Sequence, residues 1–326
     1  MAKNEKYILI TGGAGYIGGH MAGLLVDAGY RTIVFDNLST GVRPWVPQGA
    51  AFVKGDLLNI NDCRKVFKKY PISAVMHFAA KIVVPVSVSE PIVYYRNNVG
   101  GTLNLLEAMK VAGIRRFVFS STAAVYAPVD KGLLKETSEV SPQSPYGVSK
   151  HMVEKVLIDQ AKAGHIEFIT LRYFNVAGWD TDRVWPTKGR PIPTHLISNL
   201  MKALHNGGEL VVCGDDYNTP DGTGIRDFIH VLDLCRAHLL SLKAMERGIR
   251  NDIFNLGNGK GFSVMDIIKT TQKVTKRIVP FRIGPRRLGD VAVVVASSAK
   301  ARKVLGWVPQ HDLEAILKSE YAKGVF

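Results

Sequence analysis

The stretch that decides the fold is Tyr7-Ile8-Leu9-Ile10-Thr11-Gly12-Gly13-Ala14-Gly15-Tyr16-Ile17-Gly18. It begins with an apolar run typical of a strand, and a helical pattern follows it. The glycines between them match a dinucleotide-binding turn: Gly12 permits the turn, Gly15 lets a pyrophosphate approach the backbone, and Gly18 allows close helix packing. The N–H groups and dipole at the start of the helix favour negative charge. We therefore expect a dinucleotide phosphate site here.

A carboxylate follows the second expected strand, where Ile33-Val34-Phe35 leads to Asp36. At that position it can accept hydrogen bonds from both ribose hydroxyls and would repel a 2′-phosphate, which favours NAD over NADP. Arg43 is the one nearby cation in the sequence that argues otherwise. After the third and fourth strands, Asp56-Leu57 and Phe78-Ala79-Ala80 are expected to border the cofactor.

Short apolar runs alternate with helical patterns over the first two thirds of the chain, as in parallel βαβ units. The expected strands are Tyr7–Thr11, Thr32–Phe35, Ala51–Val53, Ala74–Phe78, Arg116–Ser120, Glu167–Arg172 and Asp252–Leu256. Helices are expected over Val99–Ala112 and from Pro145, the second with Ser144 as its N-cap and Gly164 at its end. The fold class is therefore α/β, with a doubly wound, parallel, seven-stranded Rossmann sheet.

From about Val176 the pattern changes to proline- and glycine-rich stretches with shorter elements. We interpret this part as a smaller α/β lid that binds the substrate. Because Asp252–Leu256 returns to the sheet, the expected cofactor-binding domain comprises residues 1–174 and 229–257. The expected substrate-binding domain comprises residues 175–228 and 258–326.

The 326 residues are 46% hydrophobic and 21% charged, which describes an ordinary globular protein rather than a disordered or fibrous one. The net charge of +14 is evenly divided, since residues 1–150 hold 17 Lys and Arg against 10 Asp and Glu, and residues 151–326 hold 25 against 18. This even spread argues against a nucleic-acid partner. No apolar stretch is long enough to span a membrane, so no membrane partner is expected. Cys63, Cys213 and Cys235 fit neither a disulfide framework nor a metal site, which indicates reduced thiols and a cytoplasmic protein.

A second group of residues predicts chemistry. Tyr146 and Lys150 are four residues apart on the helix expected from Pro145, so they share one face. An ammonium beside the phenol, together with the positive nicotinamide of NAD⁺, should lower the pKa of Tyr146 and make it a general base. Thr122 follows the fifth expected strand, where it can hold a sugar hydroxyl and relay its proton. These three are the candidate catalytic residues.

Together these residues resemble the extended short-chain dehydrogenase/reductase family, and within it the UDP-glucose 4-epimerase family. The resemblance covers nearly the whole chain. Beyond the segments already quoted, it rests on Asp36-Asn37-Leu38, Asn97-Asn98-Val99, Phe119-Ser120-Ser121-Thr122, Ser144-Pro145-Tyr146-Gly147, Leu171-Arg172-Tyr173-Phe174-Asn175, Asp221-Gly222-Thr223-Gly224-Ile225-Arg226-Asp227, Phe254-Asn255-Leu256-Gly257 and Arg286-Arg287-Leu288-Gly289-Asp290. The chain departs from the family pattern at Ile82, Cys213 and Phe228, where the family has lysine, an aromatic residue and tyrosine.

The resemblance implies an enzyme that works on bound NAD and a UDP-sugar. The implied NAD-binding residues are Gly12, Gly15, Tyr16, Ile17, Gly18, Asp36, Asn37, Asp56, Leu57, Phe78, Ala79, Ala80, Asn97, Tyr146, Lys150 and Tyr173. The implied UDP-sugar ligands are Thr122, Asn175, the Leu196 backbone, Arg226, Arg287, Asp290 and Val294. Paired arginines suit a pyrophosphate, and a carboxylate suits a ribose hydroxyl. The resemblance also implies a homodimer through the helices over Val99–Ala112 and Pro145–Ala163.

The implied reaction is reversible inversion at C4 of a UDP-hexose through a 4-keto sugar, with Tyr146 as the base. Three alternatives stay open. A related dehydratase would need an acid and a base after Thr122, where this chain has Ala123 and Ala124. A 4-epimerase or decarboxylase acting on UDP-glucuronate or a UDP-pentose is closer, and local sequence does not separate it. A non-enzymatic NAD-binding scaffold would be free to lose Tyr146 or Lys150, yet both are present.

Val294 bears on which UDP-sugars the pocket can accept. It lies four residues after Asp290, where hexose-restricted members of the family place a tyrosine and broader members a small residue. If its side chain faces the sugar, the pocket should also accept N-acetylated UDP-sugars. The alternative is that Val291-Ala292-Val293-Val294-Val295 is a strand whose side chains face the core, since strand register decides their direction.

Overall fold

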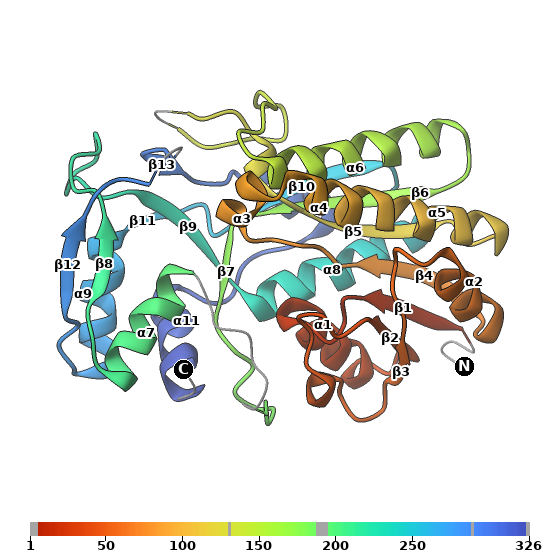
Figure 1. The fold of residues 1–326 in the computed structure, drawn as a ribbon, viewed down its shortest axis with the longest axis horizontal. Helices are drawn as coiled ribbons and strands as arrows, with labels where there is room; N and C mark the ends of the chain where they lie inside the picture. The colour runs from red at the N-terminus through yellow and green to blue at the C-terminus, as the bar shows by residue number, and fades with distance from the viewer. Residues whose placement is uncertain (1–5, 130–131, 187–194, 288–289, 324–326) are drawn as a thin grey trace.

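The computed structural model describes residues 6–129, 132–186, 195–287 and 290–323, so Leu288 and Gly289 of one quoted motif lie outside the described residues. At its centre lies a parallel sheet of seven strands in the order β10-β6-β5-β4-β1-β2-β3 (Figure 1). The strands are β1 (Tyr7–Thr11), β2 (Thr32–Asp36), β3 (Ala51–Lys54), β4 (Ile72–His77), β5 (Arg116–Thr122), β6 (Glu167–Tyr173) and β10 (Asp252–Leu256). The doubly wound α/β fold expected from the sequence is confirmed.

The order of the strands locates the binding edge of this sheet. The chain runs from β1 outward through β2 and β3, then crosses back to β4 and runs outward through β5 and β6. The switch point therefore lies between β1 and β4, and ligands of such sheets bind at the carboxyl ends of the strands beside it. Both β5 and β6 run further than expected, to Thr122 and Tyr173. These extensions carry two candidate site residues to the carboxyl edge.

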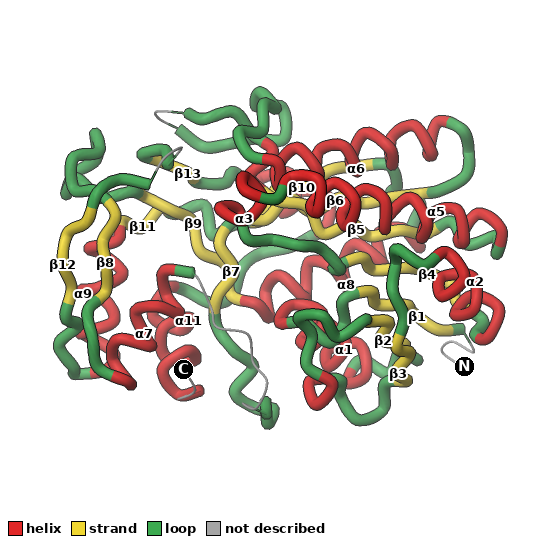
Figure 2. Tube along the Cα trace, viewed as in Figure 1, coloured by secondary structure: helices red, strands yellow, loops and turns green. Residues whose placement is uncertain are grey.

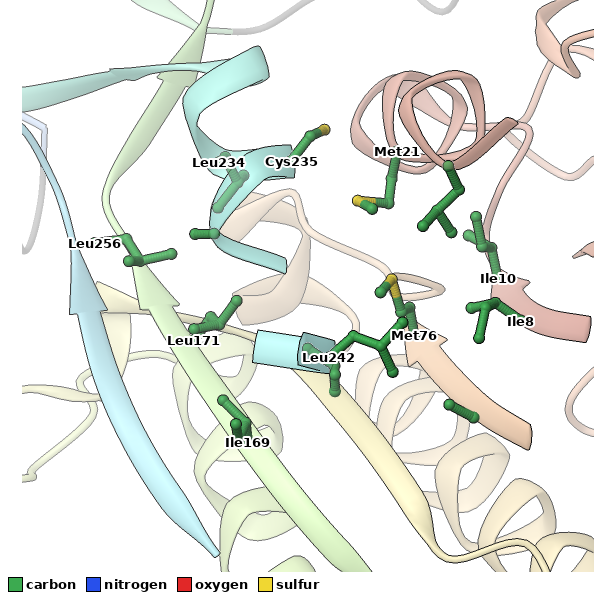
Figure 3. Close-up of a cluster of buried hydrophobic side chains, with 14 of the residues drawn as sticks. Ile8, Ile10, Met21, Met76, Ile169, Leu171, Leu234, Cys235, Leu242 and Leu256 are labelled. Carbon is green, nitrogen blue, oxygen red and sulfur yellow. The ribbon is translucent and has the colours of Figure 1, made fainter. Parts of the chain in front are cut away.

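Helices cover both faces of the sheet. The first face carries α1 (Tyr16–Asp27), α8 (Val231–Glu246) and α10 (Ala299–Leu305). The second face carries α2 (Ile60–Lys69), α5 (Gly101–Val111) and α6 (Pro145–Lys162). Successive residues of a strand point to opposite faces, so Ile8 and Ile10 enter the first core (Figure 3) and Leu9 enters the second. Burial on both faces explains why these strands read as continuous apolar runs.

A second group of elements lies to the left of the large sheet in Figures 1 and 2. Its central strand β9 (Ile225–His230) pairs with β7 (Asn175–Ala177), β11 (Gly261–Ser263) and β13 (Val293–Val294). A separate pair joins β8 (Leu210–Cys213) to β12 (Phe281–Gly284). The helices of this group are α7 (Leu196–Asn206), α9 (Val264–Thr275) and α11 (Leu313–Lys323). All three contribute to a third hydrophobic core, which is built on this group.

Helix α6, which carries two of the candidate catalytic residues, begins at Pro145 as expected. The Ser144 side chain accepts a hydrogen bond from the Gly147 N–H at 3.2 Å and so caps the first turn. Beyond the other end, Gly164 has a φ of +75°, the left-handed conformation that glycine adopts without strain.

The helix expected to begin at Val99 begins earlier and is irregular. Helical backbone already runs through α4 (Pro91–Tyr94) and the wider turn η2 (Tyr95–Gly100) before α5 begins. In that turn the Asn98 side chain donates at 3.0 Å to Ser149 Oγ of α6. This contact lies 51 residues away in sequence, so local propensity does not reveal the wide turn.

The remaining short elements are η1 (Arg43–Trp45), α3 (Val84–Ser89) and η3 (Ala123–Val125). Among the described residues, no helix combines the length and the apolar character needed to cross a membrane. Nor do three His, Cys, Asp or Glu side chains converge on a metal site anywhere in that part of the chain. Cys63, Cys213 and Cys235 are free thiols.

Candidate active site

The glycine-rich turn lies between β1 and α1, against the end of β4. Gly12 has a φ of +71°, and a Cβ there would lie 2.6 Å from the Ala79 nitrogen, so only glycine fits without rearrangement. A Cβ at Gly18 would lie 2.2 Å from the Gly12 oxygen, so α1 packs this closely only without a side chain. Gly15, the N-cap of α1, has no side chain that could cap the helix. The helix N-terminus therefore has no side-chain cap, and its N–H groups and dipole favour an anion such as a pyrophosphate.

Asp36 ends β2 and is held by the backbone around it. Its carboxylate accepts hydrogen bonds from the Ala14 N–H at 3.0 Å and from the Leu38 N–H at 2.8 Å. Each carboxylate oxygen can accept a further bond, so ribose hydroxyls can still bind there. Arg43, the cation that could have favoured a 2′-phosphate, stacks on Phe52 with its Cζ 4.5 Å from the ring centroid.

Other residues expected at the cofactor lie in loops along the same edge of the sheet. Asn37 Nδ2 donates to Asp56 Oδ2 at 3.1 Å, and Leu57 O accepts from Asn104 Nδ2 of α5 at 2.8 Å. These bonds fix the loops that follow β2 and β3. The remaining expected ligands stand at the start of α1 (Tyr16, Ile17), after β4 (Phe78, Ala79, Ala80) and in η2 (Asn97).

The structure brings Thr122, Tyr146 and Lys150 together where β5 ends and α6 begins. The Tyr146 and Thr122 hydroxyls share a hydrogen bond. Lys150 Nζ donates to the Ser120 carbonyl of β5 at 2.8 Å. Tyr173, at the end of the neighbouring strand, hydrogen-bonds to Ser120 and interacts electrostatically with Tyr146. A phenol, an alcohol and an amine therefore lie at one end of the sheet, which is the set of groups needed for proton transfer.

Burial governs the ionisation of this cluster. It raises the pKa of Tyr146 to about 12, although the hydrogen bond with Thr122 opposes the change. It also lowers the pKa of Lys150 to about 7, against the attraction of Glu154. Desolvation of the phenolate is the larger effect among the described residues, and the expected lowering of the Tyr146 pKa by Lys150 together with bound NAD⁺ stays a prediction.

Behind this cluster, Glu154 and Arg172 form a buried ion pair that sequence analysis missed. Arg172 donates to both carboxylate oxygens of Glu154, at 2.9 and 2.6 Å, and Ser121 donates to the same carboxylate at 2.5 Å. The pair joins β6 to α6, and Ser121 directly precedes Thr122. The one sequence signal for Glu154 was its spacing: it follows Lys150 by four residues and so lies on the same helix face.

The expected nucleotide ligands lie around β9 in the second group of elements. Arg226 Nη2 lies 3.5 Å from Asp290 Oδ1. Burial lowers the pKa of Arg226, and Asp290 opposes the change, while the nearby charge of Arg287 acts in the same direction as burial. Asn175 lies on β7, which pairs with β9, and Leu196 is the first residue of α7.

Val294 shares a face of this small sheet with Arg226. The two residues are opposite each other in the parallel pairing of β13 with β9, so their side chains leave the same face. Val294 packs against a cluster that contains Phe174 and that Ala123 also joins. Because Ala123 follows Thr122, this cluster reaches from the arginine side of the site to the end of β5.

A dinucleotide turn at the switch point, with a Thr-Tyr-Lys cluster at the same sheet edge, defines a nicotinamide-dependent enzyme class. The chain belongs to the NAD dependent epimerase/dehydratase family, whose family model matches residues 8–257. It is 44% identical over 306 residues to UDP-glucose 4-epimerase of Lactobacillus helveticus, covering 94% of this chain and 92% of that one. Among solved structures it is similar to UDP-glucose 4-epimerase from Brucella ovis in complex with NAD, at 40% identity and a TM-score of 0.92 over 97% of each chain. It is also similar to the Bifidobacterium longum enzyme in complex with NAD⁺ and UDP, at 33% identity and a TM-score of 0.91 over 98% of each chain.

Proposed function

We propose that this protein catalyses the reversible C4 epimerisation of a UDP-hexose, interconverting UDP-galactose and UDP-glucose on bound NAD. The observation that carries the proposal is the cluster of Thr122, Tyr146 and Lys150 at the same sheet edge as the glycine-rich turn. The relatives support it, because proteins named UDP-glucose 4-epimerase match nearly the whole chain.

In the proposed mechanism Tyr146 is the general base, and Thr122 holds the 4-hydroxyl of the sugar. NAD⁺, when bound, supplies the hydride acceptor and a positive charge that favours the phenolate. Tyr146 takes the hydroxyl proton while C4 loses its hydride, which leaves a 4-keto sugar. After the sugar has turned, bound NADH would supply the hydride to the opposite face, and Tyr146 gives its proton back to the sugar oxygen. Lys150 holds the end of β5 against α6 through the Ser120 carbonyl.

The residues proposed to hold NAD are those expected from the sequence, and the turn geometry supports them. The N-terminus of α1, which has no side-chain cap, suits the phosphates, and the Asp36 carboxylate at the end of β2 suits the ribose. The proposed set is Gly12, Gly15, Tyr16, Ile17, Gly18, Asp36, Asn37, Asp56, Leu57, Phe78, Ala79, Ala80, Asn97, Tyr146, Lys150 and Tyr173.

The proposed UDP clamp consists of Asn175, the Leu196 backbone, Arg226, Arg287 and Asp290. The loose ion pair between Arg226 and Asp290, at 3.5 Å, supports this role. A nucleotide can give both groups better partners, a phosphate for the guanidinium and a ribose hydroxyl for the carboxylate.

The small side chains of Ala123, Ala124 and Val294 bear on the type of reaction and on the substrates that we propose. Ala123 and Ala124 carry no acid or base beside Thr122, which argues against elimination of water. We include Val294 among the sugar ligands, since it lies opposite Arg226 and packs against the cluster joined by Ala123. Its small side chain supports acceptance of N-acetylated UDP-hexoses.

We also propose that the chain divides into an NAD-binding domain, residues 1–174 and 229–257, and a nucleotide-sugar domain, residues 175–228 and 258–326. The separate hydrophobic core built on α7, α9 and α11 supports this division.

We propose that the protein is a cytoplasmic homodimer. Helices α3 to α6 carry several exposed apolar side chains, namely Val86, Val88, Ile92, Leu103 and Met152. Such residues are more stable when a second copy covers them. Three free thiols support a reducing compartment.

Product identification tests the proposed reaction. The purified protein is incubated with UDP-galactose, UDP-N-acetylgalactosamine, UDP-xylose or UDP-glucuronate, and no NAD is added. The products are separated by chromatography, and their masses are measured by mass spectrometry. We expect UDP-glucose from the first substrate and no 4-keto-6-deoxy sugar from any. Conversion of UDP-glucuronate or UDP-xylose alone would overturn the choice of a hexose. A 4-keto-6-deoxy product would make the protein a dehydratase.

A further inference from the structure

The Tyr217 hydroxyl is a buried polar group without a hydrogen-bond partner in the described part of the chain. Its side chain is only 6% exposed. Burial of a hydroxyl that makes no hydrogen bond costs free energy, so such a group in a native structure requires an explanation. Two further buried side chains, Thr170 and Arg172, have an unpaired atom, and both belong to β6 in the large sheet. Among these three side chains, Tyr217 is therefore the one that lies outside the large sheet, in the loop between β8 and β9.

The Tyr217 ring is fixed in place by its neighbours. Arg286 lies over one face, with its Cζ 4.1 Å from the ring centroid, and its Nε donates to Asp216 at 2.5 Å. A Cβ at Gly214 would lie 2.9 Å from Cε2 of the ring, so the loop backbone is in close contact with it. The Tyr217 N–H donates to the Gly222 carbonyl at 2.9 Å, which closes the loop. The ring is thus held in one orientation before any ligand arrives.

The surroundings of the Tyr217 hydroxyl point to an acidic ligand. The charged side chains that act on it are those of Asp290, Arg226 and Arg286. Arg226 and Asp290 form the loose pair described above, and Arg287 acts on Arg226 from the same region. Arg226 and the Tyr217 hydroxyl, both of them donors, therefore lie close together, and Arg287 lies near Arg226. A phosphate group carries only acceptor oxygens and can bind all three.

We propose that Tyr217 is a nucleotide-binding residue whose hydroxyl donates a hydrogen bond to a phosphate oxygen of the nucleoside diphosphate. The proposal rests on the proposed function, because it places the diphosphate between Arg226 and Arg287. It adds a neutral donor to a clamp that is otherwise built from charged and amide groups. The hydroxyl remains without a partner until the nucleotide binds, and the fixed ring means that little conformational entropy is lost at that moment.

Tyr217→Phe tests the proposal, because it removes one oxygen and keeps the ring. Binding of UDP, UMP and uridine to the NAD-loaded protein is measured by titration calorimetry. We expect the Kd for UDP and UMP to rise by about tenfold, as for one lost hydrogen bond to a charged group, and the Kd for uridine to stay unchanged. In steady-state kinetics KM should rise with kcat nearly unchanged, since the nucleotide is held equally in the ground and transition states.

Thermal unfolding without nucleotide supplies the second measurement. Tyr217→Phe should leave Tm unchanged or raise it, because the hydroxyl it removes makes no bond. The matched control is Tyr126→Phe, which should lower Tm because the Tyr126 hydroxyl donates to Asn255 Oδ1 at 2.6 Å.

Each outcome decides a separate point. An unchanged Kd for UDP in Tyr217→Phe, with wild-type binding and turnover intact, would overturn the role of Tyr217 and leave the proposed function standing. An equal loss for uridine would show that the hydroxyl contacts the nucleoside and would overturn the phosphate contact. A lower Tm would show that the hydroxyl already has a structural partner. Wild-type protein that binds no UDP would instead overturn the proposed function itself.

Discussion

Replacing Glu154 by glutamine should destabilise the protein more than most single substitutions, because it leaves the Arg172 guanidinium buried without a counter-charge. Glu154 and Arg172 are 1% and 3% exposed. Burial alone raises the pKa of Glu154, but hydrogen bonds from His151, Arg172 and Ser121 outweigh it and hold the pKa below its ordinary value. The carboxylate is therefore ionised in the folded protein at neutral pH, and the substitution removes a full charge.

The size of the effect follows from the burial of both partners. Loss of one partner from a buried ion pair costs about 3–5 kcal/mol. The Glu154→Gln side chain keeps the shape and can still accept a bond from Ser121, so the lower half of that range is expected. In a chain of this length each kcal/mol lowers Tm by roughly 2 °C, which gives a fall in Tm of about 6–8 °C. Turnover should fall as well, because the pair fixes α6 and hence Tyr146 against β5.

Thermal and urea unfolding of the NAD-loaded protein measure the change. The double variant Glu154→Leu with Arg172→Met is the matched control, because it removes both charges of the pair and should recover much of the lost stability. A Glu154→Gln protein as stable as the wild type would refute the reasoning. A double variant less stable than Glu154→Gln would show that packing, not the uncompensated charge, sets the cost.

Three further predictions follow from the site and the core. Tyr146→Phe should lower kcat by about 10²–10⁴-fold while NAD remains bound, and near wild-type turnover would refute its role as base. Val294→Tyr should abolish kcat/KM for UDP-N-acetylgalactosamine and spare that for UDP-galactose, whereas equal losses would indicate a packing defect. Burial lowers the pKa of several histidines from 6.5 to about 3 or 4, so the unfolded chain gains protons below pH 6.5 that the folded chain does not. Stability should therefore fall between pH 6.5 and 4, by up to about 1.4 kcal/mol per pH unit for each such histidine, and flat urea midpoints over that range would contradict it. These histidines are His20, His77, His230 and His238.

The inner strands β1, β2 and β4 could be predicted because they are largely buried on both faces and read as mostly apolar runs. The capped start of α6 at Ser144 and Pro145 was predictable for a similar reason, since the capping bond is local in sequence. The wide turn η2 was not predictable, because Asn98 is held there by Ser149 of another helix. Local sequence patterns predict elements whose hydrogen bonds are made within the element. They do not predict elements that depend on a hydrogen bond from a side chain distant in sequence.

The candidate site shows the same division. Thr122, Tyr146 and Lys150 could be placed together because the end of a strand and a helix face are both readable from spacing. The pairing of Glu154 with Arg172 and the unpaired hydroxyl of Tyr217 depend on burial and tertiary contacts. Spacing places Glu154 on the helix face of Lys150 but does not show its partner. The same limit applies to the pKa of Tyr146, because the desolvation that raises it cannot be read from its sequence neighbours.

That pKa has a consequence for how the base can work. Burial raises the pKa of Tyr146 to about 12, so the phenol is protonated at neutral pH in the protein without a cofactor. Lys150, with a pKa of about 7 and its Nζ bonded to Ser120, does not supply a full compensating charge. In the proposed mechanism, a bound cationic nicotinamide would supply the positive charge that makes Tyr146 a stronger base, and a neutral one would not. The two directions of proton transfer require this alternation, because Tyr146 must accept a proton while the cofactor is oxidised and return it while the cofactor is reduced. In the proposed mechanism, burial of the phenol would thus make the proton step depend on the charge of the cofactor.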